Sequence, residues 1–178
     1  HVRGFFPADF FLTSESCGRC HNEIYDEWNA SAHHFSSFNN QWYRKSIEYM
    51  QDVVGTQPSK WCAGCHDHAV FFNGRFDRPI REQVDTPEAQ AGLSCTSCHS
   101  MHSQSDPIMN NVTQTDVCVT CHKGRRAELL RPSTHPMREG EMSCSDCHAP
   151  HGGTGPKLLV KDTINETCYT CHAEKRGP

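Results

Sequence analysis

Apolar side chains recur at helical spacing in only a few short stretches of this chain. Ile24, Tyr25 and Trp28 follow that spacing, and they predict one helix from residue 16 to about residue 33. Residues 41–54 form a second candidate helix. The pattern therefore predicts short helices separated by irregular segments.

Two further helix starts can be read from capping residues. Thr86-Pro87-Glu88 has the form of an N-cap followed by proline at the first helical position, leading towards Cys95. Thr163-Ile164-Asn165-Glu166 is a capping box, in which a threonine and a glutamate three residues later satisfy the first free N–H groups.

The one strand signal lies at residues 70–76. Val70–Phe72 and Arg75–Phe76 flank Asn73-Gly74, a pair typical of a two-residue turn, and together they indicate a small hairpin.

Nothing in the sequence divides the chain. Ala149–Pro156 is a loop because of its glycines and prolines, but no Gly/Ser-rich or Pro-rich linker occurs. We expect a single domain over residues 1–178 that is mainly irregular with short α-helices and has very little β structure.

The composition leaves the source of the core open. Hydrophobic types make up 35% of the 178 residues, and the mean hydropathy is −0.70. Without the 12 cysteines the apolar share falls to about 28%, against about 45–50% in ordinary globular chains. We expect something other than side chains to supply the core.

Several classes of protein are excluded by length and charge. Apolar stretches such as Phe71-Phe72 and Leu158–Val160 are far too short to span a bilayer. The net charge of −4 and the small basic cluster at residues 123–131 argue against nucleic-acid binding. The chain starts at His1 without a basic and then apolar leader, so we expect any export signal to have been removed.

All 12 cysteines occur in pairs with two residues between them, and a histidine follows each pair directly. The six motifs are Cys17/Cys20/His21, Cys62/Cys65/His66, Cys95/Cys98/His99, Cys118/Cys121/His122, Cys144/Cys147/His148 and Cys168/Cys171/His172.

Zinc sites and disulfides also use paired cysteines, but neither requires the histidine. Histidine is 13 of 178 residues, so its presence after all six pairs by chance is roughly a 10⁻⁷ event. The motif for c-type haem attachment predicts it directly, because two thioether bonds fix the porphyrin edge and the histidine binds the iron. We therefore expect six haems c.

Six large, flat, apolar cofactors would provide the core that the composition lacks. The fold is then cored by haem, with motifs on one-turn helices, and chain and cofactors fold together. We expect the chain without haem to be largely unstructured. The motifs are denser in the second half, roughly residues 91–178.

The remaining histidines match the demand for sixth iron ligands. Six haems with two histidines each need 12 of the 13 histidines, which favours low-spin, bis-histidine haems. The candidates for the distal position are His33, His34, His68, His102, His135 and His151, with His1 in reserve.

Spacing restricts which haem some of these histidines can reach. His68 lies two residues after His66, and His102 and His151 each lie three residues after a motif histidine. A segment of two or three residues is too short to reach from the motif histidine to the opposite face of the same haem. We therefore expect these three histidines to bind neighbouring haems. The choice among His1, His33 and His34 stays open on spacing alone.

Two segments resemble known families of multihaem c-type cytochromes. The run from Cys17 to His33, Cys-Gly-Arg-Cys-His-Asn-Glu-Ile-Tyr-Asp-Glu-Trp-Asn-Ala-Ser-Ala-His, resembles the first segment of cytochrome c554-like proteins. That resemblance implies that His33 rather than His34 is a distal ligand. The run from His135 to Gly152 resembles the doubled-motif modules of decahaem cytochromes that pass electrons across outer membranes, and it implies that His135 and His151 are distal ligands.

Haems with two histidine ligands have no open position, so the expected function is single-electron transfer and not catalysis. One alternative is a multihaem reductase of the nitrite or hydroxylamine type with one open iron position. No Cys-x-x-Cys-Lys motif, which the nitrite enzymes often use, occurs here. A soluble periplasmic electron shuttle is another alternative.

We expect redox partner proteins, and a place in a homo-oligomer, an extracellular filament or a membrane-associated redox complex. The phenylalanine-rich segment Phe5–Leu12 suits a subunit contact. Thioether attachment takes place outside the cytoplasm, so we expect the periplasm or the cell exterior. Sequons at Asn29, Asn111 and Asn165 leave glycosylation open.

Overall fold

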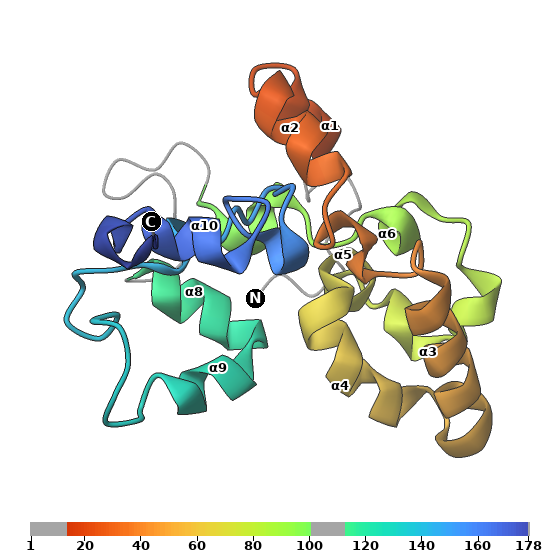
Figure 1. Ribbon diagram of the computed structural model, residues 1–178. Helices are drawn as coiled ribbons and strands as arrows, with labels where there is room; N and C mark the ends of the chain where they lie inside the picture. The colour runs from red at the N-terminus through yellow and green to blue at the C-terminus, as the bar shows by residue number, and fades with distance from the viewer. Residues whose placement is uncertain (1–13, 101–112, 178) are drawn as a thin grey trace.

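The computed structural model describes residues 14–100 and 113–177, and its regular elements are short helices (Figure 1). The α-helices are α1 (Ser14–Gly18), α2 (Asn22–Asn29), α3 (Gln41–Val54), α4 (Thr56–His66), α5 (His68–Phe72), α6 (Pro87–Gln90), α7 (Cys95–Cys98), α8 (Gln114–Cys121), α9 (Lys123–Glu128) and α10 (Ile164–Tyr169). The 3-10 helices are His34–Ser36, Arg75–Asp77, Ile80–Glu82, Cys144–Asp146, Pro156–Leu158 and Ala173–Lys175.

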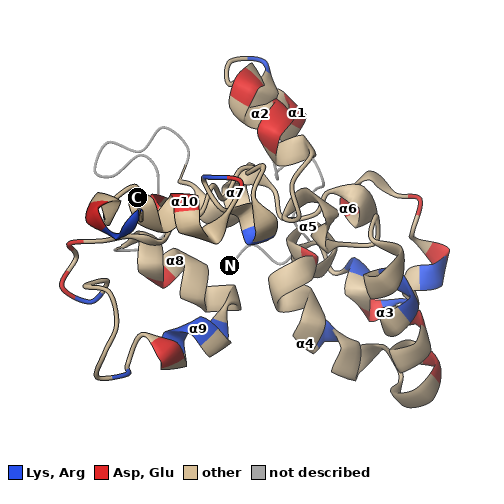
Figure 2. Cartoon of the chain, viewed as in Figure 1, with Lys and Arg blue, Asp and Glu red and all other residues tan. Residues whose placement is uncertain are grey.

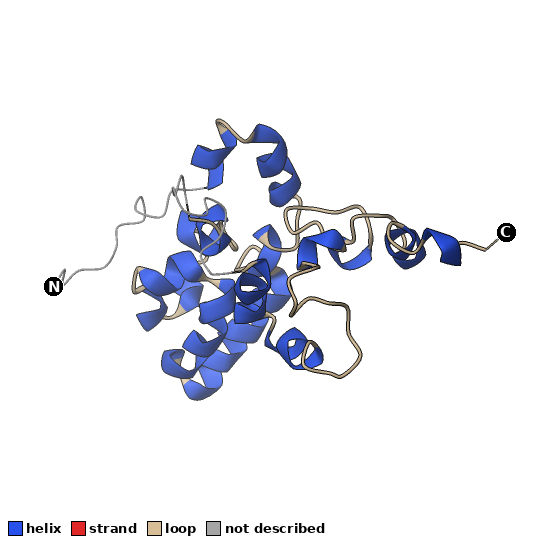
Figure 3. Ribbon diagram, turned by 90° about the vertical axis from the view of Figure 1, so that its left-hand side faces the viewer, coloured by secondary structure: helices blue, strands red, loops and turns tan. Residues whose placement is uncertain are grey.

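Almost no β structure is present, as expected. Within residues 14–100 and 113–177, it is limited to one isolated antiparallel bridge between His148 and Leu159. No strand is drawn in Figure 3 over the same residues.

The helices form two groups (Figure 1). Helices α3 to α6 lie together in one group, and α8, α9 and α10 lie in the other. The hairpin of α1 and α2 projects from between them, and α1 contacts α7 at its base. Whether the chain is a single domain of six haems stays a prediction.

The longest helix, α3, is confirmed with the predicted bounds. The Asn40 side-chain oxygen caps it by accepting hydrogen bonds from the N–H groups of Trp42 (2.9 Å) and Tyr43 (3.3 Å). The helix ends at Gly55, whose φ of 83° lies in a region that favours glycine.

The predicted single helix over residues 16–33 is wrong, because the first motif interrupts it. Helix α1 ends at Gly18 and α2 starts at Asn22, with His21 outside helical geometry (φ −116°, ψ 52°). The two helices pack closely at Gly18, where an added Cβ would lie 2.8 Å from Cγ of Tyr25. The motif makes its own turn and then redirects the chain.

The hairpin predicted at residues 70–76 is also wrong. Val70–Phe72 belongs to α5, and Arg75–Asp77 is a 3-10 turn. The expected turn needs a positive φ at both central residues, but Asn73 has φ −91° and only Gly74 is positive, at 76°. The helix and turn instead bring Val70 and Phe76 into one buried cluster.

Both predicted caps are present. Thr86 accepts a hydrogen bond from the N–H of Ala89, but α6 ends at Gln90 and does not reach Cys95. Thr163 accepts from the N–H of Glu166 at 3.2 Å and starts α10, which carries Cys168.

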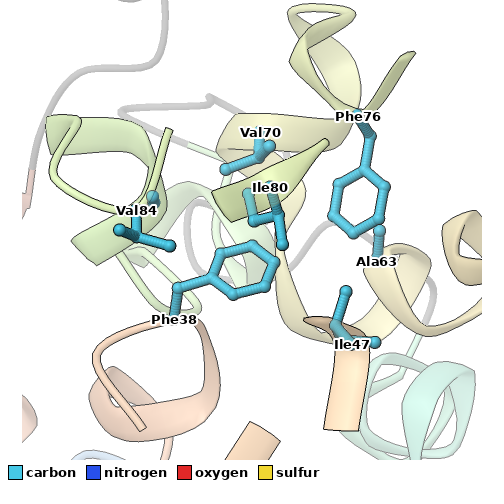
Figure 4. Close-up of a cluster of buried hydrophobic side chains, with 8 residues drawn as sticks. Phe38, Ile47, Ala63, Val70, Phe76, Ile80 and Val84 are labelled. Carbon is cyan, nitrogen blue, oxygen red and sulfur yellow. The ribbon is translucent and has the colours of Figure 1, made fainter. Parts of the chain in front are cut away.

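The first group of helices has a hydrophobic core made of side chains (Figure 4). Its buried members are Phe38, Ile47, Ala63, Val70, Phe76, Ile80, Val84 and Ala89. All of them lie between residues 38 and 89, and the Phe38 and Phe76 rings are 6.0 Å apart between centroids. A small conventional core is therefore present in spite of the low apolar content of the chain.

The second group has no comparable core. Among the described residues after 112, Val119 is the one hydrophobic side chain that is buried. The expectation of a core supplied by something other than side chains thus applies to this half of the chain.

We predict that the haem-free chain keeps residual structure only at residues 38–89. This segment buries apolar side chains without a cofactor, whereas residues 113–177 bury almost none. Hydrogen exchange with peptide-level readout should show protection at 38–89 in the haem-free chain and in both halves of the haem-loaded protein. Equal protection of both halves without haem would contradict this prediction.

Phe76→Ala should destabilise the protein by about 3–5 kcal/mol, since it removes a large side chain that is 1% exposed. Denaturant unfolding followed by far-ultraviolet circular dichroism measures the loss. Phe72→Ala is the matched control, because Phe72 is 49% exposed and its loss should cost about 1 kcal/mol or less. Similar losses in the two variants would show that the cluster does not act as a core.

Candidate functional site

Each motif closes one helical turn. The N–H of the motif histidine donates to the carbonyl of the first cysteine at 2.9–3.0 Å in five motifs, and the sixth motif lies inside α4. The five histidines are His21, His99, His122, His148 and His172. Residues three and four apart share one face of a helical turn, so two thiols and one imidazole reach the same side.

Four of the 12 motif cysteines lie at the surface and not in a buried core: Cys20, Cys98, Cys168 and Cys171 are exposed thiols. Cys20 and Cys171 nevertheless keep the motif turn, because their N–H groups donate to the carbonyls of Cys17 (3.1 Å) and Cys168 (3.2 Å). Haem attachment at each of the 12 motif cysteines stays a prediction.

Among the histidines that the structure describes, four hold the Nδ1 atom against a backbone carbonyl. The pairs are His33 with Pro150 (2.8 Å), His34 with Asn29 (2.8 Å), His66 with Ser36 (2.7 Å) and His148 with Lys157 (3.0 Å). A metal-bound histidine commonly donates its second N–H in this way, which fixes the ring and leaves Nε2 for the metal.

Three motif histidines each lie opposite a second histidine. Ring centroids are 6.3 Å apart in His33–His122 and in His135–His172. They are 5.7 Å apart in His99–His151, where the two Nε2 atoms are separated by 3.5 Å.

These separations fit an iron between two rings. Two metal–nitrogen bonds of about 2.0 Å, plus the distance from each nitrogen to its ring centre, place the centroids about 6.3 Å apart. Two pairs match this value, and the third is shorter by about 0.6 Å. The three centroid distances therefore agree with two histidines on one iron, and the assignment of these rings as haem ligands stays a prediction.

The facing rings also favour the neutral form that a ligand needs. Burial and then the His33 ring lower the pKa of His122. Burial and then the His99 ring lower the pKa of His151. A neutral imidazole can offer Nε2 to a metal without first losing a proton.

The structure does not bring every candidate to a motif histidine. His68 directs Nδ1 to the Ser97 hydroxyl and Nε2 to the Gly64 carbonyl, both at 3.0 Å. His34 packs on Trp28 at 4.5 Å between ring centroids. His1 and His102 lie outside the described residues, as do Phe5–Leu12 and the sequon at Asn111.

The cysteines of different motifs lie close together. Motifs 17–21 and 95–99 are neighbours, because α1 contacts α7, and burial and then the Cys95 thiol raise the pKa of Cys17. Burial and then the Cys65 thiol raise the pKa of Cys121 to about 12, which joins motifs 62–66 and 118–122.

The same closeness continues towards the C-terminal motif. Burial and then the Cys144 thiol raise the pKa of Cys118 to about 12, and Cys98 contributes from a third motif. Burial, Asp146, Cys168 and Cys171 raise the pKa of Cys147. All six motifs therefore belong to one connected set, a property that linear spacing does not reveal.

Sequence reasoning missed a polar cluster beside motif 62–66. The Tyr43 ring stacks on His66, with centroids 4.5 Å apart and planes 17° from parallel. Asp67 is 1% exposed and accepts hydrogen bonds from the hydroxyls of Tyr43 and Ser37. Burial raises the pKa of Asp67 to about 7, although both hydrogen bonds act in the opposite direction. The one signal of this cluster in the sequence is Asp67, an acidic residue directly after the motif histidine His66.

Charge is unevenly distributed around the motifs (Figure 2). Helices α1 and α2 carry Glu15, Glu23, Asp26 and Glu27, whereas α9 carries the basic cluster with Lys123. The Lys123 ammonium lies 5.3 Å from the centre of the Trp61 ring, beside Cys62. Basic groups here can offset haem propionates near motifs 62–66 and 118–122.

Other kinds of site find no support within the described residues. Every cysteine is a free thiol in the structure, and no disulfide joins them there. No group of three or more His, Cys, Asp or Glu side chains in residues 14–100 and 113–177 could hold a bare metal ion. None of the helices in that part of the chain is long and apolar enough to cross a membrane.

Known protein families match both halves of the chain. The family described as cytochrome c554 and c-prime matches residues 16–100, and the doubled CXXCH motif family matches residues 87–127 and 135–177. The chain is also 47% identical over 78 residues to the multiheme cytochrome MtrA of Shewanella baltica (strain OS185). That match covers 44% of this chain and 23% of the relative. The two sequence resemblances, and with them covalent haem c binding, are confirmed.

We predict that His151→Ala creates one high-spin haem. Removing the ring opposite His99 opens one iron position, whereas His151→Met supplies a thioether that keeps the iron low-spin and raises its potential. Electron paramagnetic resonance of the oxidised protein measures the spin state. An unchanged low-spin spectrum in His151→Ala would contradict the pairing of His99 with His151.

Proposed function

Since this chain is a multihaem c-type cytochrome, we propose that it conducts single electrons through six covalently bound haems c, most of them held between two histidines. When bound, the haems supply one-electron transfer. The six motifs provide 12 thiols and six motif histidines, which is one complete attachment set for each haem.

The observation that carries the proposal is the three pairs of facing histidine rings. His33–His122, His99–His151 and His135–His172 each join two segments far apart in the sequence. A histidine on either side of an iron leaves no position for a substrate. This favours an electron carrier over a reductase.

The other distal ligands belong to the same proposal. His34 is oriented as a ligand by its Nδ1 contact with the Asn29 carbonyl. His68 and His102 remain candidates on spacing, and His1 remains in reserve. These residues would serve the motifs that carry His21, His66 and His148.

The contacts between cysteines suggest a spatial order for the motifs. Motif 17–21 is next to 95–99, which is next to 118–122. From there, neighbours continue to 144–148 and then to 168–172. Motif 62–66 joins this series at 118–122, as a branch. We propose that electrons follow this series of neighbouring motifs.

Motifs 17–21 and 168–172 are the two ends of that series, and motif 62–66 ends the branch. Electron transfer between proteins requires close approach of the two redox centres, so a haem at an end of the series is better placed for exchange than one in its middle. We propose that electrons enter and leave through the haems of motifs 17–21 and 168–172.

We place the protein outside the cytoplasm, in the periplasm or at the cell exterior, because c-type haems are attached there. It would exchange electrons with redox partner proteins. We further propose that it belongs to a larger assembly, either a filament or a membrane-associated redox complex. The density of six motifs in 178 residues supports that role, since electron conduction over a distance requires closely spaced redox centres.

A redox titration of the haem-loaded protein tests the proposed function. Reduction adds one negative charge at each haem, and neighbouring haems repel one another's added electrons, so their potentials should spread. We expect a broad wave that accounts for six electrons, with mainly low-spin haems in the oxidised protein.

Two results would contradict the proposal. A single sharp wave at one potential would show that the haems do not interact. A majority of high-spin haems would show open iron positions and would favour a reductase.

A further inference from the structure

The Tyr43 ring is held on three sides beside a motif histidine. It stacks on His66, at 4.5 Å between centroids and 17° between planes. On another side lies Phe38, whose ring centroid is 5.3 Å away and whose side chain is 2% exposed. Phe38 in turn belongs to the hydrophobic core, and Tyr43 on α3 packs against the same core, so Tyr43 connects the core to the His66 imidazole.

The Tyr43 hydroxyl fixes the ring along its remaining direction. It donates a hydrogen bond to the carboxylate of Asp67, the residue that follows His66. The other carboxylate oxygen of Asp67 accepts from the Ser37 hydroxyl, and both residues are almost fully buried. Tyr43 therefore cannot rotate or slide without breaking a buried hydrogen bond.

The His66 ring has a second constraint. Its Nδ1 atom lies 2.7 Å from the carbonyl oxygen of Ser36, the residue before Ser37. That contact and the stacking on Tyr43 together determine how the imidazole plane is turned about the axis through Nε2. Neighbours of this kind orient metal ligands and tune the metal.

We propose that Tyr43 is a positioning residue that fixes the rotation of the His66 imidazole, and so the electronic state of the haem bound at Cys62 and Cys65. The inference rests on the proposed function, because it requires a haem at this motif. A side chain that matters only for packing would leave the direction of the imidazole plane unchanged.

Nuclear magnetic resonance of the oxidised, haem-loaded protein can distinguish these roles. The shifts of haem methyl signals depend on the direction of the axial imidazole plane, because the axial ligand sets the electronic structure of the haem. Tyr43→Leu removes the stacked ring. Tyr43→Phe keeps the ring but removes its hydrogen bond to Asp67.

Tyr49 provides matched controls on the same helix. It lies on α3 but is 71% exposed. Tyr49→Leu and Tyr49→Phe make the same chemical changes away from His66. Mass spectrometry of each variant counts the attached haems, so a missing haem is recognised separately from a turned ligand.

We expect Tyr43→Phe to shift the methyl signals of one haem and Tyr43→Leu to shift the same set further. The potential of that haem should also move, while both Tyr49 variants keep the wild-type spectrum. If Tyr43→Leu does not fold, Tyr43→Phe decides alone, because the proposal requires the hydroxyl to hold the ring.

Unchanged methyl shifts in the folded Tyr43 variants, with all haems attached, would overturn the positioning role but leave electron transfer intact. Shifts spread equally over several haems would also overturn it, because they indicate a general loss of packing. Absence of a haem at Cys62 and Cys65 in the wild-type protein would instead overturn the proposed function at this motif.

Discussion

Facing histidine rings join segments of the chain that have little side-chain packing between them. In the second half of the chain, Val119 is the one hydrophobic side chain among the described residues that is buried. Ordering that backbone costs about 1–2 kcal/mol per residue, and so little apolar burial cannot offset the cost. Each pair of facing rings, such as His135–His172, closes a loop at a site where an iron would bind both sides. The proposed cofactors thus explain why this half can be ordered at all.

The facing histidine rings also connect segments that are far apart in the sequence. His33 lies opposite His122, and its Nδ1 atom contacts the carbonyl of Pro150, directly before His151. His151 in turn lies opposite His99. Two ring pairs are therefore linked through one backbone contact. Neighbouring haems in such an arrangement would be held at fixed separations, as electron transfer requires.

Local features were predictable from the sequence, whereas features that depend on the motifs or on distant residues were not. Helix α3 has its predicted bounds because Asn40 and Gly55 determine its ends locally. The helix expected over residues 16–33 failed because the first motif redirects the chain at His21. The hairpin failed because Val70 and Phe76 are drawn into a core with residues from α3 and α4, which periodicity over a few residues does not reveal. For the site, the motif cysteines and histidines were readable directly, but Tyr43 meets His66 only through tertiary packing.

The first half of the chain has a hydrophobic core of side chains, whereas the second half would depend on bound haems for its stability. This difference has a functional consequence. Motif 62–66 is the one whose cysteines and histidine lie on α4, within the group that has its own hydrophobic core. Its histidine is oriented by side chains that would be ordered before any haem is attached, including Tyr43 and the buried Asp67. In the second half, His122 and His172 face partner rings, and the Lys157 carbonyl holds His148. A ligand held by a rigid core would keep its direction when the iron changes charge, so we expect the branch motif to be the position where the protein can set a potential most independently of its neighbours.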